Sequence, residues 1–277
     1  MEILVIDQSN DDATKRICLE YKSSIIRYYK NTKGGKAISL NLGIRYSKGT
    51  VIAFIDDDCI VSKTWGHNIY KNINSSDVAA ITGNTLPYNP NKHRGYLCPC
   101  TMQTSSKIIE QPEYHSENIG FGNNMVIKKY VFTRIGLFKG WLGPGSVGDN
   151  AEDADIFIRI LTAGYKIYHD SSVIVYHNKW LTADQMTRQQ LSYACGEMAC
   201  YGYYAIQGSQ FAKPVVWGNV QDSVYKVRRI IKKLLFLNWN LSVITEGKFI
   251  SIEILFRVRG LLVGWFYALI CPVLKRA

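Results

Sequence analysis

The amino-terminal third of the chain alternates short apolar runs with stretches of helical spacing. Four apolar runs have the length of strands, and two helical segments separate the first three, one ending near Leu19 and one over Ala37–Tyr46. Such alternation is typical of βαβ units. It predicts an α/β fold in which helices flank a mainly parallel sheet. The four runs are EILVID, SIIRYY, TVIAFID and VAAITG.

The pattern changes twice further along. Residues 85–118 are rich in Pro, Asn and Lys without a steady period, which indicates a long functional loop or an excursion at the sheet edge. From residue 150, the string NAEDADIFIRILTAGYKI predicts a short helix beginning near Glu152, with Ile156 and Ile160 on one face and Gly164 as its end. Two strands are expected to follow, and the acidic residues then lie in the first turn of the helix.

The remainder of the chain has a helical and aromatic pattern, with no internal repeat and no low-complexity segment. We therefore expect an α/β domain over residues 1–180 and a helical extension over residues 181–277. The 277 residues, 47% of them hydrophobic, suffice for one large core with a small addition.

Charge and cysteine content restrict the partners and the compartment. The formal net charge of +11 favours an anionic partner, which could be nucleic acid, acidic lipid or a phosphorylated substrate. The seven cysteines lack Cys-x-x-Cys spacing, which favours reduced thiols. No basic segment and apolar core typical of a secretory signal precede the first strand. These features predict a cytoplasmic protein.

Three consecutive carboxylates follow the apolar run that ends at Ile55. The carboxyl end of a strand is where open α/β sheets bind ligands. Because side chains alternate along an extended chain, Asp56 and Asp58 can point the same way while Asp57 points elsewhere. Two such oxygen ligands suit a divalent cation, Mg²⁺ or Mn²⁺, that also holds a diphosphate. A solvated acidic turn is the alternative interpretation.

Two polar turns offer further candidates. Asp7 ends the first strand, and the turn after it could cap the next helix through Ser9 or Asn10. In the segment NTKGGKA, paired glycines allow a close backbone approach while Lys33 or Lys36 meets phosphate. Each feature also fits a plain cap or loop.

Glu152, Asp153 and Asp155 form the last acidic cluster. The helix dipole favours the ionised form of a carboxylate at a helix N-terminus, which suits a general base. Charge capping of the helix explains at least one of the three. His177 would by itself more often be a core or surface histidine than a ligand.

Taken in order, these motifs resemble the family 2 glycosyltransferases of GT-A fold. The resemblance runs from Glu2 to His177 and rests on VIDQSND, GGKAISLNLGI, FIDDDC with Trp65 after it, FGNNMVIKK, and EDADIFIRILTAGYKI with the terminal VYH. It implies a metal-dependent enzyme that moves a sugar from a nucleotide-sugar, such as a UDP- or GDP-sugar, to an acceptor hydroxyl, with inversion.

The resemblance also implies residue roles. It makes Asp153 the base that deprotonates the acceptor, supported by Glu152 and Asp155. The metal would be held by Asp58 and His177, with Asp56 beside them. The donor would contact Asp7, Lys36, Asn41, Asp56 and Asp57, and the acceptor side would be lined by Gly122 and Asn123.

The chain departs from the family pattern in two places. Members usually begin with an additional central strand of the form V-S-V-I-I-P-T-Y-N, so we expect unpaired backbone in the sheet and suspect a truncated reading frame. A frequent Ala-Arg-Asn is Ser39-Leu40-Asn41 here, so no arginine is available for phosphate and Lys36 would replace it.

The carboxyl-terminal region predicts a peripheral membrane contact at the cytoplasmic face. Residues 260–274 are 15 uncharged residues between basic ones, short of the ~20 that cross a bilayer. A basic cluster lies next to Leu234, Leu235, Phe236 and Trp239, as in an interfacial helix on anionic lipid. A packed helical hairpin with a solvated basic face is the alternative. The cluster consists of Lys226, Arg228, Arg229, Lys232 and Lys233.

Membrane placement would bring a glycan or lipid-linked acceptor to the site. Two other function classes remain open. A nucleotidyltransferase also uses paired carboxylates and a metal, but it releases pyrophosphate. A basic nucleic-acid-binding or degenerate scaffold protein would bind RNA or DNA without turnover. The family resemblance argues against nucleic acid as the partner.

Overall fold

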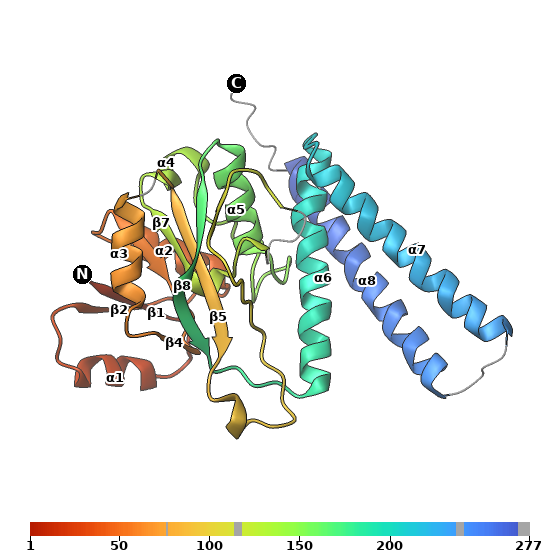
Figure 1. Ribbon diagram of the computed structural model, residues 1–277, viewed down its shortest axis with the longest axis horizontal. Helices are drawn as coiled ribbons and strands as arrows, with labels where there is room; N and C mark the ends of the chain where they lie inside the picture. Colours follow the sequence, from red (N-terminus) through yellow and green to blue (C-terminus); the bar gives the residue numbers. More distant parts are fainter. Residues whose placement is uncertain (76, 114–117, 237–240, 271–277) are drawn as a thin grey trace. The chain divides into compact units, whose positions relative to one another are not determined.

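The computed structural model describes residues 1–75, 77–113, 118–236 and 241–270, with side chains left aside at 75, 234–236 and 241–244. The chain divides into two compact units. The α/β unit comprises residues 1–146 and 152–186, and the helical unit comprises residues 147–151 and 187–277. Figure 1 shows the elements of both.

The predicted alternation at the start of the chain is confirmed. Strand β1 (Ile3–Asp7), helix α1 (Ala13–Glu20), strand β2 (Ile26–Lys30), helix α2 (Lys36–Tyr46) and strand β3 (Val51–Phe54) follow one another. β1 and β2 are parallel, as a βαβ unit requires, and their register sets Asp7 opposite Lys30. Both residues therefore lie at the same end of this small sheet.

Six of the described strands form the central sheet, in the order β3-β7-β5-β8-β4 with β6 also paired to β8. The long strands β5 and β8 run side by side in Figure 1. The remaining elements of this unit are β4 (Cys59–Val61), α3 (Trp65–Ser75), β5 (Ala80–Pro87), β6 (Lys107–Ile109), β7 (Met125–Lys128), α4 (Val131–Ile135), α5 (Glu152–Thr162) and β8 (Ile167–His177).

The expectation of a mainly parallel sheet is wrong, although the α/β fold is confirmed. Only β1/β2 and β5/β8 are parallel among the described pairs, whereas β3/β7, β5/β7, β4/β8 and β6/β8 are antiparallel. An apolar run has no direction in itself. The direction of β7 is set by the excursion after β5, where no crossover helix of the kind that parallel neighbours need is present in the described residues.

The segment 85–118 is an excursion at the sheet edge, as predicted. After β5 the chain makes a single 3₁₀ turn, η1 (Pro90–Lys92), and returns as β6, which pairs with β8. His93 stacks on Trp180 with ring centroids 4.4 Å apart, and Leu97 bridges to Leu181. These contacts hold the excursion against the chain that leaves β8.

The two strands expected after Gly164 are instead one long strand, β8. Its register against β5 shifts between Gly83, opposite Asp170, and Asn84, opposite Ile174, so the polar stretch 170–172 continues into a bulge over 171–173 rather than a turn. A β-carbon at Gly83 would overlap the carbonyl oxygen of Val173. The bulge therefore depends on glycine at that position.

Helix α5 begins at Glu152, as predicted, and Gly164 follows it with a φ of +82°. Ile156 and Ile160 are fully buried, in a core that also contains Phe54 and Ile127. The apolar face of α5 thus packs on the sheet, and its acidic first turn lies at the edge of the core.

Among the described strands, β1 pairs only with β2, and β3 pairs only with β7. Ile3 remains 43% exposed and Ala53 of β3 is also exposed. The two sheets thus each end in an open edge. The expectation of an upstream strand stays a prediction.

The helical unit contains most of α6 (Ala183–Ile206) together with α7 (Ala212–Phe236) and α8 (Leu241–Ile270). Small residues let α8 approach α6, because β-carbons at Gly260 and Gly264 would overlap the carbonyl oxygens of Cys195 and Ala199. Within the described part of the chain, none of the helices is long and apolar enough to cross a membrane.

Part of the predicted membrane element lies outside the described residues. This holds for Trp239, Lys275 and Arg276, for the end of the run 260–274, and for the side chains of Leu234, Leu235 and Phe236.

Candidate active site

Asp58 and His177 meet because a short strand brings them together. β4 pairs with the end of β8, and the register sets Cys59 opposite His177. His177 Nε2 lies 3.3 Å from Asp58 Oδ1. The other ring nitrogen, Nδ1, lies 2.6 Å from the carbonyl oxygen of Pro99, to which it donates. This bond orients Nε2 toward the acidic turn, as second-sphere carbonyls do for metal-binding histidines.

These side chains fit a divalent cation. Ligand atoms of Asp58, Cys59 and His177 all lie within 4.8 Å of one another. A carboxylate oxygen and an imidazole nitrogen are ligands that Mn²⁺ and Mg²⁺ accept, and both cations also take diphosphate oxygens. Burial raises the pKa of Cys59 to about 12, so its sulfur is a neutral thiol without a metal.

Without a metal, Asp58 and His177 stabilise each other's charge. The hydrogen bond from His177 is the main reason that the pKa of Asp58 lies below its ordinary range. Burial lowers the pKa of His177, but the bonds to Asp58 and Pro99 outweigh it and raise this pKa. A cation at this site would replace the proton on Nε2.

Lys36 connects the acidic turn after β3 to the start of α5. It is the first residue of α2, after Gly35, whose φ of +104° favours glycine. Its Nζ lies 2.8 Å from Asp56 Oδ1 and 3.3 Å from Glu152 Oε1. Burial lowers the pKa of Lys36, but the charges of Glu152 and Asp56 raise it above its ordinary value. Lys36 is therefore a cation bound by two carboxylates.

Glu152 is almost fully buried, at 3% exposure. One oxygen faces Lys36, whereas Oε2 has no hydrogen-bond partner among the described residues. Burial raises the pKa of this carboxyl to about 7, against the opposing effect of Lys36. Glu152 can thus carry a proton near neutral pH.

Asp153 is half-buried and held by two backbone N–H groups. Gly122 N donates to Oδ2 at 2.8 Å, and Ala154 N donates to Oδ1 at 2.8 Å. A β-carbon at Gly122 would lie 3.0 Å from that of Asp153. The carboxylate is therefore oriented by the FGNN segment and by its own helix.

The FGNN segment is itself fixed by buried side-chain bonds. Asn123 Oδ1 accepts from the Thr85 hydroxyl at 2.9 Å. Asn124 Oδ1 accepts from Trp65 Nε1 at 3.0 Å, and its amide nitrogen donates to Asn84 O at 2.8 Å. These bonds explain why Trp65, seven residues after Asp58, belongs to the motif set.

Asp155 is fully buried and forms ion pairs with Lys139 and Arg159. Arg159 Nε donates to Asp155 Oδ2 at 2.9 Å, and its NH1 donates to Ile135 O at 2.6 Å. The carboxylate thus joins α5 to the segment after α4. This arrangement supports α5 and leaves the neighbouring Asp153 as the accessible acid.

Asp7 is buried at the end of β1. Ser9 N donates to its Oδ1 at 2.8 Å, and Tyr28 Oη donates to its Oδ2 at 2.7 Å, with Lys30 Nζ 3.2 Å away. Burial raises the pKa of Asp7, but these bonds outweigh it and hold the pKa well below its usual range. A permanently ionised acceptor of hydrogen bonds results.

The predicted cap of α1 by Ser9 or Asn10 is wrong. Asp12 is the N-cap residue, and the side chain of Asp11 accepts from Ala13 N at 2.9 Å. Ser9 lies three residues before the N-cap position, and its hydroxyl instead donates to the carbonyl oxygen of Asp11 at 3.2 Å.

Asn41 and Asp57 differ in their use. Both polar atoms of the Asn41 side chain bond the backbone of Phe138, at 2.8 and 2.9 Å, which ties α2 to that segment. Asp57 is exposed in a turn after β3, whereas Asp56 and Asp58 beside it are half-buried. The side chain of Asn41 is thus engaged within the protein.

Sequence reasoning did not identify the groups that orient the main candidates. Tyr28 and Lys30 hold Asp7, and the parallel register of β1 and β2 was the signal that could have found them. The carbonyl of Pro99 holds His177, and Cys59 lies beside both metal-ligand candidates. A backbone carbonyl leaves no signal in the sequence.

Comparisons with known proteins agree with this geometry. Residues 1–136 match the model for glycosyl transferase family 2. The glycosyltransferase AglE of Haloferax volcanii is 25% identical over 182 residues, which is 64% of this chain and 56% of AglE. GlyG of Streptococcus pneumoniae is 27% identical over 100 residues, 35% of this chain and 33% of GlyG. The chain thus spans little more than half the length of AglE and a smaller share of GlyG.

Among solved structures, S. aureus TarS 1–349 in complex with UDP-GlcNAc superposes with a TM-score of 0.58 at 14% identity, over 95% of this chain and 80% of that one. A second crystal structure of S. aureus TarS 1–349 gives a TM-score of 0.54 at 12% identity, over 99% of this chain and 83% of that one. This likeness shows the GT-A fold. Family match, fold and motif order together identify residues 1–136 as part of a family 2 glycosyltransferase domain.

Proposed function

We propose that the protein transfers a sugar from a nucleoside-diphosphate sugar to an acceptor hydroxyl, with inversion. The observation that carries this proposal is the contact of Lys36 with both Asp56 and Glu152. It joins the acidic turn, where a diphosphate would bind, to the first turn of α5, where Asp153 is poised as a base. Donor and acceptor chemistry are thus adjacent.

A uridine diphosphate sugar is the donor we propose. Asp7, held ionised, accepts hydrogen bonds from the base, and the exposed edge of the acidic turn, Asp56 and Asp57, faces the ribose and diphosphate. Structures of TarS in complex with UDP and with UDP-GlcNAc support this choice through their common fold. Lys36 offers the cation for phosphate that an arginine supplies elsewhere in the family.

Asp153 acts as the general base in this proposal. It accepts the proton of the acceptor hydroxyl as the hydroxyl oxygen attacks the anomeric carbon from the face opposite the leaving diphosphate. The N–H groups of Gly122 and Ala154 hold its two oxygens in a fixed orientation. Gly122 and Asn123 line the acceptor side.

Asp58 and His177 would hold the divalent cation, Mg²⁺ or Mn²⁺. When bound, the cation neutralises the diphosphate and so stabilises the leaving group. Asp58 supplies a charged oxygen and His177 a nitrogen that is aimed by Pro99. Asp56 is engaged with Lys36 and would reach the cation only with the donor in place.

The acceptor we propose is a glycan or lipid-linked hydroxyl at the cytoplasmic membrane face. A matching relative of Bacillus subtilis, 28% identical over 88 residues, 29% of this chain and 10% of its own length, is named minor teichoic acid biosynthesis protein GgaB. Basic side chains on α7 support a membrane contact, although Lys226, Arg229 and Lys233 are paired with Glu253 and Glu246. Arg228 pairs with none of the described carboxylates and so remains for anionic lipid.

The test is turnover of a panel of nucleotide-sugars by the full chain, followed as release of nucleoside diphosphate. We expect turnover with a UDP-sugar and Mn²⁺. Asp58→Asn should abolish it, and Asp153→Asn should still bind UDP but lose transfer by about a hundredfold, the usual contribution of a positioned base. The matched control is Asp77→Asn, at an exposed aspartate outside the acidic turn and outside α5.

Three outcomes would contradict the proposal. Full activity in excess chelator would exclude the metal role. Release of pyrophosphate would identify a nucleotidyltransferase instead. Salt-dependent binding of RNA or DNA, without turnover of any donor, would identify a scaffold protein.

A further inference from the structure

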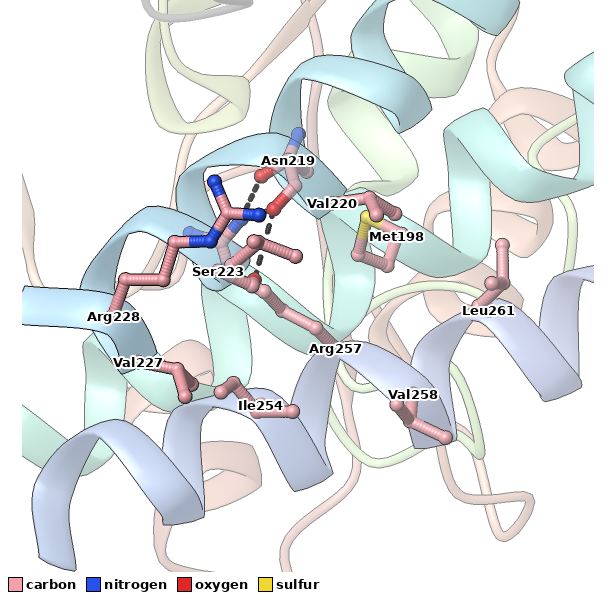
Figure 2. Close-up of a pocket in the computed structure, with 11 residues that line it drawn as sticks. Met198, Asn219, Val220, Ser223, Val227, Arg228, Ile254, Arg257, Val258 and Leu261 are labelled. Atoms are coloured by element: carbon pink, nitrogen blue, oxygen red, sulfur yellow. Dashed lines mark hydrogen bonds between the residues drawn. The ribbon is translucent and has the colours of Figure 1, made fainter. Parts of the chain in front are cut away.

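The helical unit contains an apolar cavity of about 480 Å³ between two helices. Figure 2 shows its lining. Helix α7 contributes Val220, Val224 and Val227, and helix α8 contributes a matching stripe. That stripe is Ile254, Val258 and Leu261. Both stripes have the spacing of one helix face, and the volume is in the range of small-ligand sites.

Side chains of the protein do not fill the space between these two aliphatic stripes. Met198 of α6, only 3% exposed, closes the cavity floor. By contrast Val220, Val224 and Val258 remain 37%, 44% and 48% exposed. Exposed apolar side chains that cluster around a hollow indicate a binding surface.

Two arginines, Arg257 and Arg228, lie at the rim of the cavity, and they differ in whether a carboxylate pairs with them. Arg257 is neutralised, since its NH2 lies 2.7 Å from Glu253 Oε1 and 3.4 Å from Asp222 Oδ2. Arg228 has no ion pair with any described carboxylate. The rim therefore presents one uncompensated guanidinium, which is suited to a phosphate.

We propose that this cavity binds one acyl chain of an anionic phospholipid, whose phosphate contacts Arg228. An apolar chain matches the aliphatic stripes, and an anionic headgroup matches Arg228, which pairs with none of the described carboxylates. A peptide occupant is disfavoured because it would bring backbone N–H and C=O groups against a lining that offers them few partners. The inference rests on the proposed membrane placement and adds a lipid site to it.

The experiment uses the full chain and a single-chain probe, lysophosphatidylglycerol, below its micelle concentration. We expect saturable binding of one lipid per chain by calorimetry and native mass spectrometry. Lysophosphatidylcholine, whose headgroup is neutral overall, should bind about tenfold more weakly, as expected for loss of one charged contact.

Matched variants separate the chain from the headgroup. Val224→Phe fills the cavity and should weaken both lipids about tenfold or more. Gln221→Phe, exposed on the same helix and outside the lining, adds the same ring and should change neither. Arg228→Gln should bring the two lipids to similar affinity. Lys232→Gln, a neighbouring basic residue outside the lining, should keep the difference.

The results of this experiment distinguish failure of the lipid site from failure of the proposed function. Donor turnover should be unchanged in Val224→Phe, and its loss with preserved lipid binding would overturn the assignment. Unaltered lipid binding by Val224→Phe would also overturn it. If the full chain floats with anionic vesicles but binds no single-chain lipid, the cavity proposal fails while membrane placement stands. If one lipid binds saturably but the chain does not float with anionic vesicles, the lipid site is supported and the membrane placement fails.

Discussion

Glu152 offers the sharpest test of the electrostatics inside the site. The carboxyl is 3% exposed, and burial raises its pKa from an ordinary 4.5 to about 7. The folded state thus holds this proton more tightly than the unfolded state does. Between about pH 4.5 and 7 the unfolded chain releases the proton first, so the free energy of unfolding must fall as pH rises and level off above 7.

The size of this fall follows from the shift. Each unit of pKa difference corresponds to about 1.4 kcal/mol, so Glu152 can contribute at most about 3 kcal/mol over this window. The pKa of about 7 already includes the opposing charge of Lys36, 3.3 Å away, and we expect about 2–3 kcal/mol. Glu152→Gln removes the titrating group while keeping its shape.

The assay is urea unfolding of parent and Glu152→Gln between pH 4.5 and 8. The difference in unfolding free energy, parent minus variant, should fall by about 2–3 kcal/mol across the range, because other groups cancel. Glu20→Gln, exposed on α1, should give a constant difference. A constant difference for Glu152→Gln would refute the reasoning, and a rising one would show that Lys36 holds the carboxylate ionised.

Three further predictions concern support of the site. Asp155→Asn should cost about 3–5 kcal/mol in thermal unfolding because Lys139 and Arg159 lose their buried carboxylate, and a melt like that of the parent would remove this role. Gly83→Ala should prevent stable folding by overlap with Val173 O, whereas Gly34→Ala, with open space around it, should fold; equal stability would contradict the bulge. His177→Gln should lose the Mn²⁺-induced rise in Tm expected of the parent with UDP, and an undiminished rise would place the cation elsewhere.

The sequence was most informative where a single residue type decides local structure. Gly164 ended α5 because it adopts a positive φ, and the apolar spacing of Ile156 and Ile160 fixed the buried face of that helix. The polar residues 170–172 misled because a bulge and a turn have the same composition. The direction of each strand could not be predicted from the sequence either, because strand pairing depends on segments that lie far apart in the chain.

The candidate site shows the same division. The acidic residues after β3 and at the start of α5 were visible as clusters. The contact of Asp58 with His177 depends on β4, a strand of three residues that carries no periodic signal, and only the family resemblance anticipated it. The ion pairs of Lys36 also escaped prediction because they join three separate elements.

The division of the strands between two hydrogen-bonded sheets has a consequence for ligand binding. Asp7 lies on the β1–β2 sheet, whereas Asp56 follows a strand of the central sheet. In the described residues no backbone ladder joins these sheets, and the ion pair of Lys36 with Asp56 connects the start of α2, which follows β2, to the turn after β3. A donor that contacts both Asp7 and Asp56 would therefore link the two sheets. Donor binding would stabilise the β1–β2 sheet against local unfolding, and amide hydrogen exchange in β1 and β2 would slow. The substrate would thus complete the folding of its own site.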